Sequence, residues 1–161
     1  MGSCLAASAR VLLCDFGSAT TRAKVYEARK DIVEEEERIQ AQTTVAYRAP
    51  EMVDLYQKKR VDDKVDVWAL GVLLFTMLFG RFPFDPQFPL GILSGAFAFP
   101  APERGEDSGE RVARQVISAC LQVDPAARPS ARKVLQMLDV VELPQIQGGA
   151  EARQGWGDEA V

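Results

Sequence analysis

Two short motifs, far apart in the sequence, decide its interpretation. Residues 11–20 read Val-Leu-Leu-Cys-Asp-Phe-Gly-Ser-Ala-Thr, an apolar run that ends at Asp15-Phe16-Gly17. Ala49-Pro50-Glu51 begins thirty-two residues after Gly17. Asp-Phe-Gly alone is a weak signal, because any tripeptide occurs by chance. The second motif at this distance, with Asp66-Val67-Trp68 and Arg128 further along, argues against a chance match.

These motifs are similar to the two ends of a protein-kinase activation segment, and the chain resembles the C-terminal lobe of a kinase. The resemblance implies a mainly helical fold. The short apolar run at 11–14 predicts a buried β-strand that delivers Asp15, and Gly17 permits the turn that follows. The N-terminal lobe is expected to be missing, because the fourteen residues before Asp15 hold neither a glycine-rich phosphate loop nor a lysine-bearing strand.

The composition describes a globular chain. Its 161 residues make one ordinary domain, which should bury roughly 68–70% of the surface of the unfolded chain. A net charge of −4 argues against a nucleic-acid partner or an anionic membrane surface. The apolar run at 67–79 has thirteen residues where a membrane span needs about 18–20, so no transmembrane segment is expected.

The sequence contains no histidine and no asparagine. This excludes every histidine-dependent mechanism. It also excludes a kinase catalytic loop of the form His-Arg-Asp-x-x-x-x-Asn, whose aspartate accepts the proton of the substrate hydroxyl and whose asparagine holds the second magnesium ion. No Arg-Asp dipeptide replaces it, so neither the catalytic base nor the strand lysine is among the expected site residues.

The three cysteines, Cys4, Cys14 and Cys120, are an odd number without a Cys-x-x-Cys pair. Neither a zinc site nor a disulfide framework is therefore indicated, and a reduced, intracellular location is expected.

Three regions are expected along the chain. Residues 1–10 lack the basic start and long apolar core of a signal peptide and are predicted to be a non-native or unstructured start. Residues 11–143 are predicted to be a partial kinase domain. Residues 144–161 have too little apolar material to pack and are predicted to be a disordered tail.

The acidic stretch 31–40 is predicted to be a helix. Asp31 can cap its start, with Glu34 three residues later as a capping box requires, and Ile32 and Ile39 fall on one face. Its charges form either a solvated helix face or a docking surface for a basic substrate.

Three further helices follow. Residues 65–79 are apolar nearly all round and predict a helix buried on every side. Residues 80–110 predict turns and very short helices. Residues 112–123 are helical by period, and Ser130 can cap a last helix. The apolar positions of these two helices are Val112, Val116, Ala119, Cys120 and Val123, and Val134, Leu135 and Leu138.

Three stretches resemble the Numb-associated kinase family, which includes the adaptor-associated and cyclin-G-associated kinases. They are Leu-Cys-Asp-Phe-Gly-Ser-Ala-Thr at 13–20, the acidic run and the segment after it at 33–56, and Asp-Val-Trp-Ala-Leu-Gly at 66–71. In that family the acidic segment is similar to an extra helix after the activation loop.

The resemblance assigns Asp15 to the magnesium ion that bridges the ATP phosphates. Phe16 is expected to pack against the N-terminal lobe. Cys14 is expected to line the back of the nucleotide pocket as a small, buried and unreactive side chain.

Other residues are assigned structural roles by the same resemblance. Glu51 and Arg128 are expected to form a buried ion pair that ties the activation segment to the lobe. Asp66 is expected to be a buried carboxylate with a raised pKa, because the catalytic loop it would bond is absent. The remaining motif residues are Gly17, Ala49, Pro50 and Trp68.

Thr44, Tyr47 and Arg48 are expected to belong to the loop that contacts the substrate residue after the phosphorylated one. Thr44 stands three residues before Tyr47, a spacing that favours serine/threonine specificity. A role for Thr43 and Thr44 as simple turn residues stays open.

The family implies a cytoplasmic Ser/Thr kinase that uses ATP and Mg²⁺ and acts on protein substrates, among them clathrin-adaptor subunits and endocytic regulators at membranes. Three interpretations stay open. The chain is a fragment of an active kinase, a truncated protein-binding module without catalysis, or a relic without a stable fold.

Overall fold

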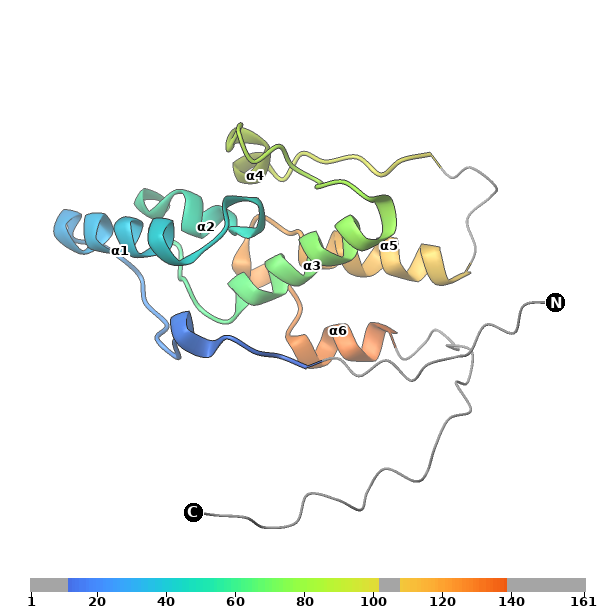
Figure 1. Ribbon diagram of the computed structural model, residues 1–161, viewed down its shortest axis with the longest axis horizontal. Helices are drawn as coiled ribbons and strands as arrows, with labels where there is room; N and C mark the ends of the chain where they lie inside the picture. Colours follow the sequence, from blue (N-terminus) through green and yellow to red (C-terminus); the bar gives the residue numbers. More distant parts are fainter. Residues whose placement is uncertain (1–11, 102–107, 139–161) are drawn as a thin grey trace, which may run out of the picture. The chain divides into compact units, whose positions relative to one another are not determined.

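The computed structural model describes residues 12–101 and 108–138, and this part is mainly helical, as predicted (Figure 1). Of these residues, 12–16 belong to one compact unit and those from Gly17 onward belong to another. The expectations for residues 1–10 and 144–161 lie outside the described residues. The α-helices are α1 (Arg29–Gln42), α2 (Pro50–Val53), α3 (Lys64–Phe79), α4 (Leu90–Ser94), α5 (Ser108–Cys120) and α6 (Ala131–Leu138); the one-turn 3-10 helices are η1 (Phe16–Ser18), η2 (Val45–Tyr47), η3 (Leu55–Gln57) and η4 (Pro125–Ala127).

The β-strand predicted before Asp15 is not formed in residues 12–14. Leu12 and Leu13 are 74% and 84% exposed, and no β-ladder includes them. A strand is stable only when a neighbour pairs with its backbone, and the described residues offer this one no partner. The β-bridge found in this part of the chain lies elsewhere, between Lys24 and Val61.

Helix α1 starts earlier than predicted and without the predicted cap. It begins at Arg29, and no side chain caps its first turn. The Asp31 carboxylate instead accepts a hydrogen bond of 2.7 Å from the Lys24 ammonium, and this bond lowers the pKa of Asp31. Ile32 and Ile39 are both buried on one face of α1, as predicted.

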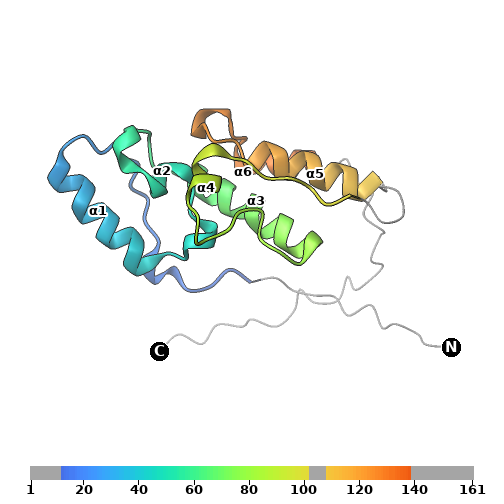
Figure 2. The same ribbon diagram turned by 90° about the horizontal axis from the view of Figure 1, so that it is seen from above.

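Helix α3 packs along α5, and the two helices approach closely at Gly71 (Figures 1 and 2). A Cβ atom at Gly71 would lie 2.7 Å from the Cβ of Cys120, which is buried on α5. Only glycine fits this contact without a shift of backbone. Helix α3 ends at Phe79 and is capped by Gly80, whose φ of +65° is the left-handed conformation that glycine adopts without strain.

One face of α3 is exposed, which corrects the expectation of a helix buried on every side. Trp68, Val72 and Phe75 are buried, whereas Leu73 and Met77 are 43% and 73% exposed. Apolar character all round indicated full burial, but the described residues pack against only part of the circumference. No helix in this part of the chain has both the length and the apolar character to cross a membrane.

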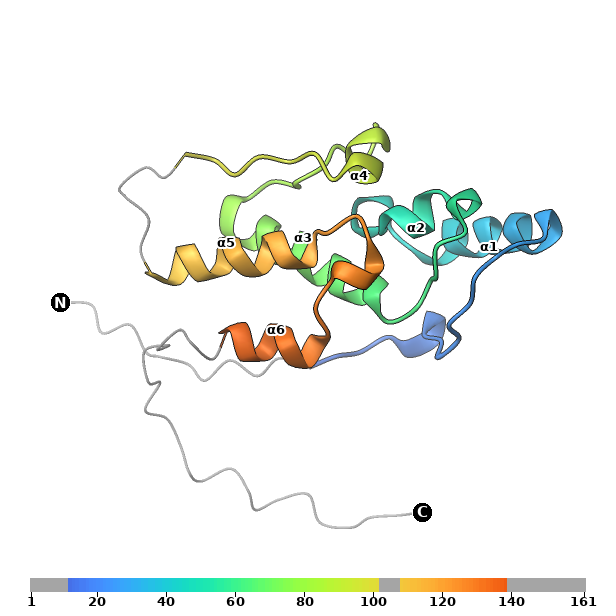
Figure 3. The same cartoon turned by 180° about the vertical axis from the view of Figure 1, so that it is seen from behind.

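The last two helices largely follow their predicted pattern. On α5, Val116 and Cys120 are buried and α6 packs against the same helix. Figure 3 shows the loop that contains η4 leading from the end of α5 to the start of α6. The Ser130 hydroxyl accepts a hydrogen bond from the Lys133 N–H, as a cap should, but Leu135 is 59% exposed and faces away from the core.

Three buried clusters hold together the described residues between 17 and 138. The largest surrounds Trp68, which stacks on Phe84 at 5.3 Å, and includes residues of α3, α4 and α5. A second lies under α1, between Ile32, Ile39 and Tyr26. The third joins α3, α5 and α6 around Val116. Together they fix the segment from α1 to α2, where the candidate site lies.

Candidate functional site

The segment between α1 and α2 carries three predicted site residues. Thr44 lies at the surface directly before the single turn η2, and the rings of Tyr47 and Phe82 pack nearly perpendicular with their centroids 5.7 Å apart. Arg48 is half-buried and turns back toward α1. The structure therefore brings Tyr47 and Arg48 into contact with the fold and leaves Thr44 exposed.

The Arg48 guanidinium is held by the C-terminal end of α1. Its Nε donates to the Thr43 hydroxyl at 2.8 Å, and its Nη2 donates to the carbonyls of Thr43 and Ile39 at 2.8 and 3.3 Å. These carbonyls lie at the C-terminal end of α1, and that of Ile39 also accepts hydrogen bonds from the Thr43 N–H at 3.0 Å and from the Thr43 hydroxyl at 2.6 Å. Burial lowers the pKa of Arg48, yet an arginine stays charged at neutral pH.

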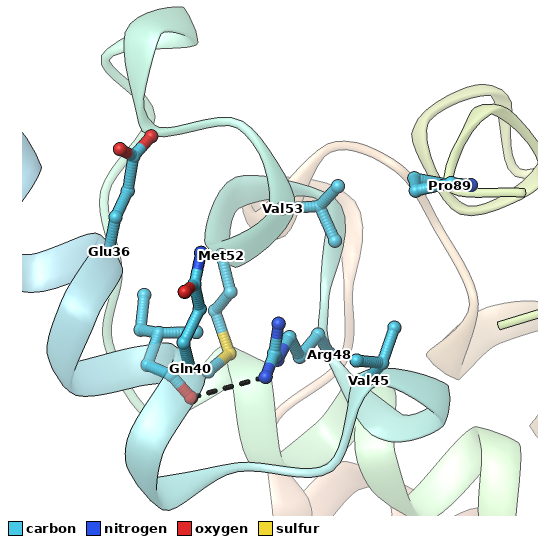
Figure 4. Close-up of a pocket in the computed structure, with 8 residues that line it drawn as sticks. Glu36, Gln40, Val45, Arg48, Met52, Val53 and Pro89 are labelled. Atoms are coloured by element: carbon cyan, nitrogen blue, oxygen red, sulfur yellow. Dashed lines mark hydrogen bonds between the residues drawn. The ribbon is translucent and has the colours of Figure 1, made fainter. Parts of the chain in front are cut away.

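Arg48 lines a small pocket between α1 and α2 (Figure 4). Its volume is about 190 Å³, below the roughly 300–1,000 Å³ of sites for small molecules, so it suits amino-acid side chains better than a nucleotide. The lining residues are Glu36, Ile39 and Gln40 of α1, Val45 of η2, Arg48, Met52 and Val53 of α2, and Pro89.

A polar cluster fixes α1 against the preceding loop. Arg38 donates hydrogen bonds from its Nε and Nη2 to the Glu35 carboxylate, and the hydroxyl of buried Tyr26 also bonds Glu35. Burial alone would raise the pKa of Glu35, but these bonds and the Arg38 charge outweigh it and lower the pKa. Burial and the same carboxylate raise the pKa of Tyr26.

The expected ion pair between Glu51 and Arg128 is present. Both Arg128 terminal nitrogens donate to the two Glu51 carboxylate oxygens at 2.7 Å, and both side chains are fully buried. Arg128 also donates to the carbonyl oxygens of Lys64 and Gln122. The pair therefore links α2, the start of α3 and the loop after α5.

Trp68 and Asp66 differ in burial: Trp68 lies in the core and Asp66 at the surface. The Trp68 ring lies beneath the Arg128 guanidinium at 5.0 Å in the core. Asp66 is exposed, which corrects the expectation of a buried carboxylate, because it lies on the uncovered side of α3. Partial desolvation and the neighbouring charge of Asp63 still raise the pKa of Asp66, as expected.

Residues 14–16 form no assembled site in the described part of the chain. Asp15 has a φ of +63°, an uncommon conformation for a residue with a side chain, and Phe16 is 63% exposed. Cys14 is exposed, not buried as predicted, because the described residues give this stretch no neighbouring strand to pack on.

Comparison with known proteins settles the family. The protein kinase domain matches residues 4–138. The chain belongs to the protein kinase family. Its helical fold is that of a kinase C-terminal lobe.

Similar kinases come from several organisms. The serine/threonine-protein kinase ppk30 of Schizosaccharomyces pombe is 35% identical over 145 residues, which are 87% of this chain and 15% of that protein. A probable serine/threonine-protein kinase of Dictyostelium discoideum is 39% identical over 134 residues, 83% of this chain and 16% of its own. Actin-regulating kinase 1 of Saccharomyces cerevisiae is 31% identical over 130 residues, which are 81% of this chain and 20% of that protein. The chain thus spans a fifth or less of each of these relatives.

Protein kinases generally use ATP with Mg²⁺. Magnesium demands near-octahedral coordination by oxygen. In the described residues no group of three or more carboxylate, histidine or cysteine side chains could hold a metal ion.

Sequence reasoning missed most of the pocket. Glu36 and Gln40 lie four residues apart, with Ile39 on the adjoining face, so helical spacing could have placed both on one side of α1. Met52 and Pro89 reach the pocket only through tertiary packing, so no local sequence pattern predicts that they line it. The bond between Tyr26 and Glu35 was missed for the same reason.

Proposed function

We propose that this kinase-family chain is part of a Ser/Thr protein kinase that transfers the γ-phosphate of ATP to serine or threonine residues of protein substrates. The observation that carries the proposal is the fixed segment from Thr44 to Glu51. Its end is anchored in the core by Arg128, and its middle lines a pocket of side-chain size. Such a segment suits the binding of an extended protein substrate.

The roles of the individual residues belong to this proposal. Asp15 would bind Mg²⁺, and Thr44, Tyr47 and Arg48 would contact the substrate next to the phosphorylated residue. Asp15 supplies a carboxylate, the ligand type that magnesium takes from proteins. The serine/threonine preference is supported by the named relatives.

We also propose membership of the Numb-associated kinases, cytoplasmic location and substrates among clathrin-adaptor and endocytic proteins. The support is the resemblance of three stretches, one of which contains the acidic run. That run forms most of α1, directly before Thr44.

A phosphoryl-transfer assay tests the proposal. A longer protein that contains residues 1–161 after a complete kinase N-terminal lobe is incubated with labelled ATP and a mixed Ser/Thr substrate, beside its Asp15→Ala variant. We expect transfer that the substitution abolishes, because the metal ligand is lost. Residues 1–161 alone are expected to transfer no phosphate, since the sequence holds no catalytic base. Transfer to tyrosine only, or none from the longer protein, would contradict the proposal.

A second candidate function is a non-catalytic module that binds kinase substrates. It is favoured by the absence of histidine, asparagine and an Arg-Asp dipeptide from the sequence, while the pocket is formed entirely by residues 36–89. A native protein of 17.7 kDa, detected with an antibody against α1, would support this function.

A further inference from the structure

The pocket between α1 and α2 contains two opposite charges that do not pair with each other. Glu36 and Arg48 both line it, but no ion pair within 4.0 Å joins them. Figure 4 shows the Glu36 carboxylate projecting away from the Arg48 guanidinium. We call this site the dipolar pocket.

The positive end has hydrogen-bonding capacity to spare. Arg48 uses Nε and Nη2 to hold Thr43 and Ile39, and within the described residues its Nη1 donates to no acceptor. A guanidinium has five N–H donors, so two remain for a ligand. No carboxylate of the described residues neutralises Arg48, and a carboxylate is the partner whose geometry fits it best.

The negative end is equally unpaired. Glu36 is half-buried, and no cation of the described residues lies within 4.0 Å of its carboxylate. Elsewhere on α1, Glu34 pairs with Lys30 and Glu35 pairs with Arg38. Glu36 and the exposed Glu37 have no such partner among the described residues, and of these two only Glu36 lines the pocket.

The floor between the two ends is apolar. Ile39, Val45, Met52 and Val53 contribute it. Such a surface suits the aliphatic stems of long charged side chains, whose heads can then reach an opposite charge. A purely apolar occupant would desolvate both charges without a partner, which costs free energy. A singly charged occupant would meet a like charge at one end.

We propose that the dipolar pocket selects a segment of the substrate protein that carries one acidic and one basic side chain, the acid facing Arg48 and the base facing Glu36. The proposal rests on the proposed function, because it names the substrate class of the same site. Glu36 thereby becomes a specificity residue supplied by the helix before Thr44.

The first experiment measures binding of short fluorescein-labelled peptides to residues 1–161 by fluorescence anisotropy. The peptides carry one Glu and one Lys at several spacings in both orders, and matched peptides replace Glu, Lys or both by Gln. We expect the best peptide with both charges to bind about fivefold more tightly than either single replacement, the effect of losing one partly exposed ion pair. Equal binding of all peptides, or no binding of any, overturns the proposal.

A charge reversal gives the sharper test. In Glu36→Lys the preference at the basic position should invert, so that a peptide with Glu in place of Lys binds better. Glu34→Lys is the matched control, because it makes the same change on the same helix at a residue outside the pocket. Inversion in Glu36→Lys alone supports the proposal, and the same response in both variants overturns it.

Arg48→Gln tests the other end. The variant should lose its preference for the Glu peptide over the matched Gln peptide while keeping its preference for Lys. Loss of neither preference overturns the proposal. Anisotropy requires no phosphoryl transfer, so a failure here is distinguishable from a failure of the kinase assay.

Discussion

At the scale of single residues, Arg128 joins segments that lie far apart in the sequence. It bonds both oxygens of Glu51 and three backbone carbonyls and lies over the face of Trp68, all from one buried position. Its own carbonyl accepts a hydrogen bond from the Lys64 ammonium at 2.7 Å. A side chain with five donors in a fixed plane can satisfy this set, whereas lysine cannot.

Arg128→Ala is expected to lower the free energy of unfolding by about 3–5 kcal/mol, because the Glu51 carboxylate would stay buried without its partner. Thermal or urea denaturation measures the loss, which corresponds to a fall in Tm of several degrees. The exposed Arg132 provides the control, and Arg132→Ala should change stability by less than about 0.5 kcal/mol. Equal melting of both variants would show that the buried pair contributes little.

Glu35 should make the anchoring of α1 sensitive to acid. Its pKa in the folded protein is lower than the usual 4.5, so the carboxylate stabilises the fold above that pH. The contribution is lost as the pH falls through the lowered pKa, because the unfolded state then binds more protons than the folded state. The Tm of Glu35→Gln should therefore fall less than that of the wild type between neutral pH and a pH below the folded pKa. Parallel profiles would contradict this.

At the scale of elements, sequence patterns predicted helices better where a local signal decided the outcome. Ser130 caps α6, and the seven-residue spacing of Ile32 and Ile39 placed both in the core. The prediction that Asp31 caps the start of α1 was wrong, because the Asp31 carboxylate forms an ion pair with Lys24, which lies outside the helix. The prediction that α3 is buried on every side was wrong, because an apolar sequence does not show which faces of a helix pack against other segments.

Gly71→Ala tests the contact between α3 and α5. The added methyl group would overlap the Cβ of Cys120 and press on Leu121, so we expect a loss of about 1–3 kcal/mol from overpacking. Gly91→Ala is the matched control, because its Cβ would meet Phe84 at an ordinary 3.7 Å. In a helix that substitution should be neutral or stabilising. Chemical denaturation of the two variants measures the difference.

At the scale of the whole molecule, the sequence motifs predicted the protein family and the core contact between Glu51 and Arg128, but they did not predict the pocket. Glu51 and Arg128 are 77 residues apart, and their pairing followed from the family resemblance. The pocket joins α1, α2 and Pro89, and the neighbourhood of such residues depends on the packing of all three segments. The exposure of Phe16 and Cys14 likewise depends on which segments surround them.

Because Cys120 is buried at the contact between α3 and α5, the rate at which its thiol is alkylated reports how often the two helices separate. Desolvation raises its pKa to about 11, so almost no thiolate exists at neutral pH to react with an alkylating reagent. Exposed Cys14 should be alkylated at once, whereas Cys120 should react only in molecules whose two helices have separated. Peptide mass spectrometry of iodoacetamide-treated protein measures both rates, and Gly71→Ala should accelerate the Cys120 reaction selectively. Labelling of Cys120 as fast as Cys14 would mean that the two helices part freely in the native protein.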